Sequence, residues 1–471
     1  MAEFIPIALL MCGSVFLLLL LPLLLLSSKK KCPANAGIPT GSMGWLWFGE
    51  TLDFLKPHPP NSMGTFLQQH CSRYGKVFKS HLFGSPTVVS CDHEFNLFVL
   101  RNEGKLFLGS YPKAMHGILG NFSLLIISGD LHKRLRSQVV RFASTCKSNP
   151  KYLSYIEKLS ISMMESWKDR NQIFFHNEAR KFLFNLTVKQ VLSIEPEEPL
   201  ATKILEDFLT FMKGFVSIPL SIPGTDYTKA VKARARITSI LKGIMMERRS
   251  NKRVEKGDFL DMLLDSADLS DEEILSVVMD TLLGGYETTS TLLALIVYFL
   301  GQAPYVLNQL KDEHQSIRKS KGYGDPLNWE DYKKMNFTSC VVQEVLRCGN
   351  IVKFVHRRAL RDVKFRGYVI PAGWKVLPVF TAAHLDPSLH QNPSQFDPWR
   401  WADVRMNKKV TPFGGGPRLC PGIELAKVET ALFLHHLVLN YRWKLTEDSP
   451  LAYPYVDFQR GLPLKIAHVQ S

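Results

Sequence analysis

The sequence predicts a mainly α-helical fold with a smaller β-rich part, preceded by one N-terminal transmembrane helix. An uncharged apolar run from Phe4 to Leu26 is long enough to cross a bilayer core of about 30 Å. A helical pattern that starts at Ser270 continues for roughly thirty residues and would form a rod about 45 Å long. Short β-rich runs bounded by Gly and Pro lie on both sides of the helical middle of the chain.

The composition fits a globular protein with an ample core. The chain has 471 residues, of which 45% are hydrophobic and 21% charged, and this length allows one large enzyme domain or two to three average ones. The formal net charge is +15, and no basic block is longer than Lys29-Lys30-Lys31. This spread of charge argues against nucleic-acid binding and suits a protein close to anionic lipid or to an acidic partner.

The apolar N-terminal run predicts an uncleaved membrane anchor. A cleaved signal peptide is the alternative, but its leader is normally basic and a small-residue cleavage site follows it. Here the leader carries Glu3, and the lysines come after the run, which places the rest of the chain in the cytosol. We expect an anchor over residues 1–28, a Pro- and Gly-rich linker over 29–50 and the main domain over 51–471.

The first part of the main domain mixes a helix with strands. We expect a helix around Asn61 to Tyr74, followed by strands at Val77–Phe83 and Thr87–Cys91. Gly84-Ser85-Pro86 would join these strands as a hairpin turn. The stretch from Asn102 to Asp130 has no clear period, and we expect it to be irregular.

Helices dominate the middle of the chain. Residues 131–256 carry helical patterns, broken at Asn149-Pro150, at Pro196 and between Pro219 and Gly224. Ser270 then reads as the N-cap of the long helix, because Glu273 completes a capping box. That helix should end before Pro304.

Shorter elements complete the domain. We expect helices at Tyr305–Lys319 and Phe337–Cys348, a β-rich stretch at Val363–Phe380 and a helix at Ile423–Val438. The loop before this last helix contains Cys420. Helix N–H groups and the nearby charge of Arg418 would favour its thiolate form, and Gly414 to Gly416 would allow main chain to pack against a flat cofactor. The alternative is a buried, inert thiol.

The long helix contains an unusual segment, Gly284-Gly285-Tyr286-Glu287-Thr288-Thr289-Ser290. Two glycines inside a helix cost about 1 kcal/mol each relative to alanine. Hydroxyl groups that bond back to carbonyls can also bend a helix, and a local opening would leave room for a small ligand. The alternative is a close helix crossing at the glycines, with Glu287 paired elsewhere.

The loop motif Phe413-x-x-Gly-x-Arg-x-Cys420-x-Gly resembles the haem-thiolate signature of the cytochrome P-450 monooxygenases. The resemblance extends from Pro39 to Ile466 and makes residues 51–471 a haem-thiolate monooxygenase domain. It implies that Cys420 ligates the iron of haem b and that Phe413 contacts the haem. Thr288 would hydrogen-bond the bound dioxygen, and Glu287 would help relay protons from water.

Further motifs carry the same resemblance. Glu344-x-x-Arg347 and the segment Phe396-x-Pro-x-Arg400-Trp look like the family's buried ionic lock, a structural element behind the cysteine loop. His132 and Arg136, which lie four residues apart, match the helix that holds the haem propionates.

Arg418 and Arg357 match the other cationic contacts of the haem in this family. At the second of these positions the sequence leaves Arg357 and Arg358 as alternatives, because the strand register is not fixed.

The resemblance also implies partners. The chain has no Gly-x-Gly-x-x-Gly fingerprint and no flavin domain, so its electrons would come from a separate NADPH-cytochrome P-450 reductase on the endoplasmic reticulum membrane. A haem-thiolate isomerase or dehydratase and a non-catalytic haem sensor or carrier are the alternatives. The first of these tends to lack the acid–alcohol pair that Glu287 and Thr288 form here.

The predicted substrate is large and lipophilic. Segments such as Phe354 to Leu360 and Pro454 to Phe458 resemble plant steroid hydroxylases of brassinosteroid biosynthesis, and among them the type that hydroxylates side-chain carbon 22 of a campesterol-type sterol. The residues that would face such a substrate are Met115, Ile118, Leu119, Phe122, Phe208, Phe211, Met212, Phe215, Val216, Leu283, Tyr286, Ile351, Val352, Phe354, Val355, Val456 and Phe458.

Overall fold

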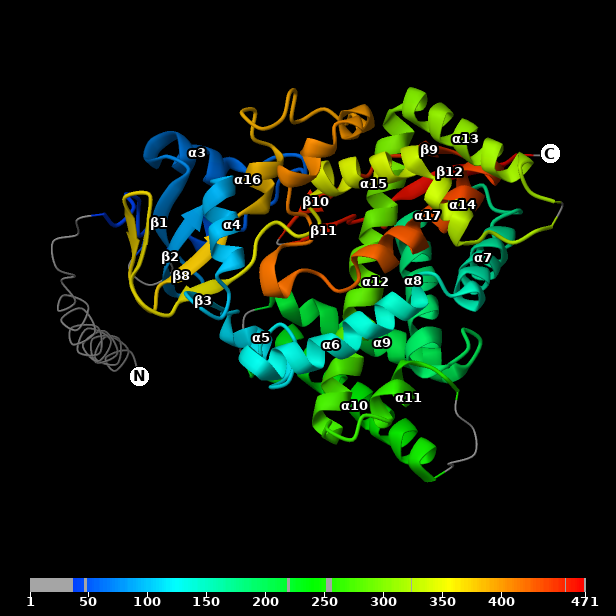
Figure 1. Cartoon of the computed structure of the whole chain (residues 1–471), viewed down its shortest axis with the longest axis horizontal. Helices are drawn as coiled ribbons and strands as arrows, with labels where there is room; N and C mark the ends of the chain where they lie inside the picture. The colour runs from blue at the N-terminus through cyan, green and yellow to red at the C-terminus, as the bar shows by residue number, and fades with distance from the viewer. Residues whose placement is uncertain are drawn as a thin grey trace, which may run out of the picture.

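The computed structural model describes residues 37–45, 49–217, 221–250, 256–322, 324–453 and 455–469. Figure 1 shows a large helical body beside a smaller part that contains most of the strands. The predicted anchor at Phe4–Leu26 lies outside the described residues, so it stays a prediction. Among those residues, only the helix at Asp271–Gln302 is long and apolar enough to cross a membrane, and most of it is buried inside the protein.

Helices make up most of the described chain, as expected. The α-helices are α2 (Thr51–Phe54), α3 (Thr65–Tyr74), α4 (His93–Arg101), α5 (Lys113–Leu119), α6 (Gly129–Cys146), α7 (Pro150–Glu165), α8 (Phe175–Leu192), α9 (Pro199–Lys213), α10 (Asp226–Ser250), α11 (Phe259–Leu264), α12 (Asp271–Gln302), α13 (Pro304–Lys319), α14 (Trp329–Lys334), α15 (Asn336–Gly349), α16 (Phe380–His384) and α17 (Ile423–Asn440). Short 3₁₀ helices are η1 (Gly214–Val216), η2 (Pro398–Ala402), η3 (Val404–Lys408) and η4 (Gly416–Arg418).

The described strands form one five-stranded sheet and three smaller ones. The five-stranded sheet has the order β1-β2-β8-β5-β3, and β4-β12-β9, β6-β7 and β10-β11 pair separately. The strands are β1 (Val77–Leu82), β2 (Ser85–Ser90), β3 (Phe107–Gly109), β4 (Gln172–Phe174), β5 (Arg357–Ala359), β6 (Val363–Phe365), β7 (Tyr368–Ile370), β8 (Lys375–Pro378), β9 (Tyr441–Leu445), β10 (Leu451–Ala452), β11 (Val456–Asp457) and β12 (Pro463–His468).

The predicted hairpin of β1 and β2 is confirmed, but its turn was placed wrongly. Leu82 pairs with Ser85, so the two turn residues are Phe83 and Gly84, with φ of 52° and 73°. A two-residue turn with both φ values positive matches the right-handed twist of the strands. Ser85 and its neighbour Pro86 therefore belong to β2 and not to the turn.

The stretch expected to be irregular, Asn102–Asp130, contains two regular elements. β3 pairs antiparallel with β5, and α5 precedes the loop that leads to α6. β3 is only three residues long and finds its partner about 250 residues later in the chain. A period within the local sequence carries no information about such a distant pairing.

Helix α12 runs through the centre of the helical body (Figure 1). The predicted capping box is present: the Ser270 side chain accepts from the N–H of Glu273, and the Glu273 side chain accepts from the N–H of Ser270. The helix contains 32 residues, which at 1.5 Å per residue span about 48 Å. α8, α15 and α17 pack around it.

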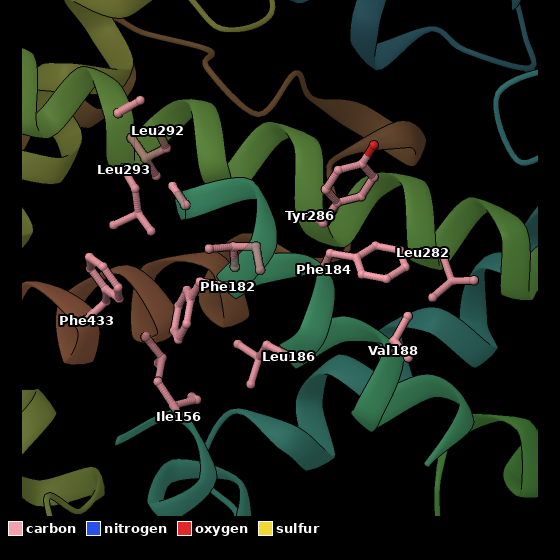
Figure 2. Packing of buried hydrophobic residues seen from close by; sticks show 14 of the residues in the cluster. Ile156, Phe182, Phe184, Leu186, Val188, Leu282, Tyr286, Leu292, Leu293 and Phe433 are labelled. Atoms are coloured by element: carbon pink, nitrogen blue, oxygen red, sulfur yellow. The ribbon is translucent and has the colours of Figure 1, made fainter. Parts of the chain in front are cut away.

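The contact between α8 and α12 includes Tyr286, which was expected to face the substrate. This side chain is fully buried. Its ring lies 5.7 Å from that of Phe184 and 6.1 Å from that of Phe208. Figure 2 shows Tyr286 and Leu282 of α12 packed beside Phe184 of α8. On this face of α12 the apolar side chains form the protein core.

The predicted ionic lock is confirmed. Glu344 Oε1 lies 2.7 Å from Arg347 Nη2 and 3.0 Å from Arg400 Nε. The indole N–H of Trp401 donates to Glu344 Oε2 over 2.8 Å. Burial opposes ionisation of Glu344, but the hydrogen bonds and charges of the two arginines outweigh it and lower its pKa. The lock joins α15 to η2, which leads toward the Cys420 loop.

We predict that Glu344→Gln lowers the free energy of unfolding by at least about 3 kcal/mol, because it leaves two buried arginines without their counter-charge. Because folding lowers the pKa of Glu344, its contribution exists above the ordinary carboxyl pKa and is lost as the pH falls through the lowered value. Urea denaturation at several pH values measures both effects.

The matched control is Glu330→Gln, which removes an exposed pair with Lys333 and should change stability by less than about 0.5 kcal/mol. Equal stability of the two variants at neutral pH would contradict the structural role of Glu344.

Candidate active site

The Cys420 loop lies immediately before α17, as the sequence predicts. The backbone N–H of Cys420 donates to the carbonyl of Phe413 over 3.1 Å, which closes the loop. The ring of Phe413 packs partly buried against the main core. At the start of the loop, the N–H of Thr411 donates to Nε2 of the buried His384 over 3.0 Å. These bonds fix a segment that is too rich in Gly and Pro to form a helix or a strand.

Two glycines of the loop, Gly414 and Gly416, occupy their positions for different structural reasons. Gly416 has a φ of +64°, and a Cβ on it would lie only 2.0 Å from the carbonyl oxygen of Leu100. Its small size is therefore needed where the loop packs on α4. Gly414 has a φ of +72°, and a Cβ on it would have no heavy atom within 4 Å. Of these two glycines, Gly414 is the one that leaves room for a further group.

The pKa of the Cys420 thiol shifts in the direction opposite to the prediction. Burial raises the pKa of the thiol, although the N–H of Gly422 and the charge of Arg136 act to lower it. The N–H of Gly422, at the N-terminus of α17, thus lowers the pKa of the thiol, but by less than burial raises it. The charge that lowers the pKa is that of Arg136, since Arg418 points elsewhere. A bound metal cation would supply the remaining driving force for deprotonation.

His132, Arg136, Arg357 and Arg418, which we call the cationic cluster, come together behind the loop. Arg136 donates from Nη2 to the carbonyl of Leu419 over 2.6 Å, and Arg418 donates to the carbonyls of Leu124 and Ile127. The charges of Arg136, Arg357 and Arg418 all act on the pKa of His132. His132 and Arg136 of α6 therefore form one group with Arg357 of β5 and Arg418 of the Cys420 loop.

Arg357 and Arg358 point in opposite directions from β5. In β5 the side chain of Arg357 is buried, with 2% exposure, while Arg358 points outward. Arg357 pairs with Glu103 over 2.7 Å, and Glu103 also pairs with Arg418 over 2.6 Å. The sequence analysis missed Glu103, because no motif marks it and both partners lie more than 250 residues away.

The donors of the cationic cluster fit a dicarboxylate such as haem b. Burial, together with the charges of Arg418 and Arg136, lowers the pKa of His132 to about 4, so His132 is neutral and still carries one N–H donor. The buried Nε of Arg136 has no partner among the described residues. Buried donors without partners are rare, and a bound carboxylate would satisfy them.

On α12, the two glycines serve different purposes. A Cβ on Gly285 would lie 2.9 Å from the side chain of Thr187 in α8, whereas one on Gly284 would meet nothing within 4 Å. Gly284 and Thr288 are exposed, although Tyr286 and Thr289 on the same turns are buried. An accessible space therefore lies beside Gly284 and Thr288, and Gly285 provides the close helix crossing.

The predicted opening of α12 does not occur. The hydroxyl of Thr288 donates to the carbonyl of Gly284 over 3.0 Å, and the helix continues without a break from Asp271 to Gln302. A back-bonded hydroxyl can be accommodated within a regular helix. The space beside Gly284 comes from its missing side chain instead.

Glu287 is held by an arginine that the sequence analysis missed. Its Oε1 pairs with Arg180 Nη2 of α8 over 2.5 Å, and the same nitrogen lies 3.2 Å from Asp457. His176 Nδ1 lies 3.3 Å from Asp457. Glu287 and Arg180 are each about one-fifth exposed, so this network reaches solvent. No hydrogen bond or ion pair joins it to the Cys420 loop in the described part of the chain.

Known proteins of plants match nearly the whole chain. Cytochrome P450 724B1 of Oryza sativa subsp. japonica is 58% identical over 96% of this chain and 96% of its own length. Cholesterol 22-monohydroxylase CYP90B51 of Trigonella foenum-graecum is 44% identical over 96% of both chains. A steroid (22S)-hydroxylase of Brachypodium distachyon is 43% identical over 94% of this chain and 89% of its own.

The three-dimensional structure agrees with these sequence matches. The solved structure of retinoic acid bound cyanobacterial CYP120A1 aligns with a TM-score of 0.82 and 26% identity, covering 92% of this chain and 100% of that one. The predicted fold, mainly helical with a smaller sheet part, is therefore confirmed. The family model described as Cytochrome P450 matches residues 39–458. The chain belongs to the cytochrome P450 family.

Proposed function

We propose that this protein is a haem-thiolate monooxygenase that hydroxylates a plant steroid at side-chain carbon 22, in brassinosteroid biosynthesis. The observation that carries the proposal is the position of Cys420, in a closed loop before α17 with unpaired cationic donors behind it. Steroid hydroxylases at 43–44% identity over nearly the whole chain support the substrate class.

In this proposal Cys420 holds the iron of haem b, and the four residues of the cationic cluster hold its two carboxylates. Phe413 packs beside the loop, and Gly414 leaves the space that the cofactor needs. When bound, a haem with a thiolate ligand activates dioxygen for insertion of one oxygen atom into a C–H bond.

Thr288 and Glu287 would manage protons. The Thr288 hydroxyl lies beside the accessible space. It can rotate away from the Gly284 carbonyl and donate its hydrogen bond into that space instead. Both oxygens of Glu287 accept from Arg180, and its side chain is about one-fifth exposed, so it can exchange a proton with water when it separates from Arg180. The network of Arg180, Asp457 and His176 would then hold Glu287 between turnovers.

The substrate and partners follow from the same proposal. A campesterol-type sterol is largely apolar. It therefore matches the apolar residues that were predicted to face the substrate. Electrons would come from NADPH-cytochrome P-450 reductase. The N-terminal run at Phe4–Leu26 would anchor the protein in the endoplasmic reticulum membrane with its catalytic domain in the cytosol.

Reconstitution with the reductase, NADPH and single sterols tests the substrate. We expect campesterol-type sterols to give a product heavier by one oxygen atom, with fragmentation that places the hydroxyl on the side chain. The same sterols without NADPH are the control. Turnover of another lipid but of none of these sterols would contradict the steroid assignment and leave the monooxygenase assignment intact.

We predict that Thr288→Ala leaves haem content unchanged but lowers the product formed per NADPH consumed several-fold, because protons no longer reach the oxygen in an ordered way. The lost electrons should appear as hydrogen peroxide or water. Thr288→Ser keeps the hydroxyl and should retain most of the coupling. Thr288→Ala with wild-type coupling would show that this hydroxyl has no part in proton delivery.

A further inference from the structure

Glu103 is a buried carboxylate that lies between two arginines of the cationic cluster. It follows the C-terminus of α4 and is only 8% exposed. Its Oε2 lies 2.7 Å from Arg357 Nε, and its Oε1 lies 2.6 Å from Arg418 Nε. Oε1 also accepts from the backbone N–H of Gly109 over 3.0 Å. One carboxylate thus connects strand β5, the Cys420 loop and the end of strand β3.

The arginines keep donors for a ligand in spite of this carboxylate. Each guanidinium has five N–H bonds. Arg418 uses its Nε–H on Glu103 and two others on the carbonyls of Leu124 and Ile127. Arg357 contacts Glu103 through Nε and donates from Nη1 to the carbonyl of His356. Glu103 therefore pairs with both arginines at Nε, by a hydrogen bond with Arg418 and by charge with Arg357, and other N–H groups of both arginines stay free to bind a carboxylate.

Glu103 also changes the charge of the cluster. Arg136, Arg357 and Arg418 carry three positive charges, while burial keeps His132 neutral. The carboxylate of Glu103 reduces the net charge from three to two, which equals the number of carboxylates on haem b. An excess buried charge would be costly, because charges in a low-dielectric environment need partners.

We propose that Glu103 is a positioning residue for the cofactor, which aligns Arg357 and Arg418 and matches the charge of the cationic cluster to the two haem carboxylates. A purely structural role would make Glu103 matter for folding alone. A positioning and charge-balancing role also affects haem retention and the reduction potential of the iron, since a negative charge near the haem stabilises the oxidised form.

The test compares Glu103→Gln, Glu103→Asp and Glu94→Gln in the haem-bound protein. Glu94 lies on α4 and forms an exposed pair with Arg366, so Glu94→Gln removes a carboxylate from the same region without touching the cluster. Three quantities are measured: the rate of haem transfer to apomyoglobin, the ferric–ferrous midpoint potential and the thermal unfolding midpoint.

Glu103→Gln should release haem about ten times faster than wild type, and its potential should become more positive. Glu103→Asp keeps the charge but has a shorter reach, so it should release haem faster at a nearly unchanged potential. Glu94→Gln should match wild type. Wild-type haem release in Glu103→Asp would overturn the alignment role, even if Glu103→Gln failed to fold, and a potential that is unchanged in Glu103→Gln would overturn the charge role.

The inference rests on the haem site proposed above, and the same measurements separate the two. A wild-type protein that bound no haem would refute both. If the wild type binds haem and Glu103→Gln has the same haem release and midpoint potential as the wild type, only the role of Glu103 is refuted.

Discussion

The ion pairs of the buried Glu344 carboxylate with Arg347 and Arg400 hold the segment that leads to the active site. The stretch from α16 to α17 contains only short 3₁₀ helices among its described residues, so side-chain bonds have to fix it. Glu344 supplies them by binding Arg347, Arg400, the indole of Trp401 and the backbone N–H of Asp397. Since buried charges are unfavourable unless they are paired, this segment has one strongly favoured position. The Cys420 loop then follows in a defined place before α17.

Three of the glutamates that pair with arginines have proposed roles at the site, and their exposure separates these roles. Glu344 is fully buried, which suits a fixed structural support. Glu103 is nearly buried and touches two arginines that keep free donors, which suits the alignment of a cofactor. Glu287 is partly exposed and has one arginine partner that is also partly exposed, which suits a group that exchanges protons. The same pair of residue types would thus serve three different proposed roles.

Local sequence patterns predicted the parts of the fold that local interactions determine. The capping box of Ser270 and Glu273 and the break at Asn149-Pro150 depend on residues within one helical turn, and both are present. The family motifs likewise located Cys420, Glu344 and the cationic residues. What the sequence could not provide depends on contacts between distant residues. Glu103 and Arg418 are 315 positions apart, and Arg180 and Glu287 are 107 apart. The burial of Arg357 and the exposure of Arg358 follow from the register of β5.

We propose that Cys420 binds the iron of a haem through its sulfur, and X-ray absorption at the iron edge detects such an iron–sulfur bond. The ferric wild-type protein should show one sulfur atom in the first coordination shell, together with the porphyrin nitrogens, and Cys420→Ala should lose that sulfur. A wild-type shell of nitrogen and oxygen alone, or a sulfur that persists in Cys420→Ala, would show that Cys420 does not bind the iron.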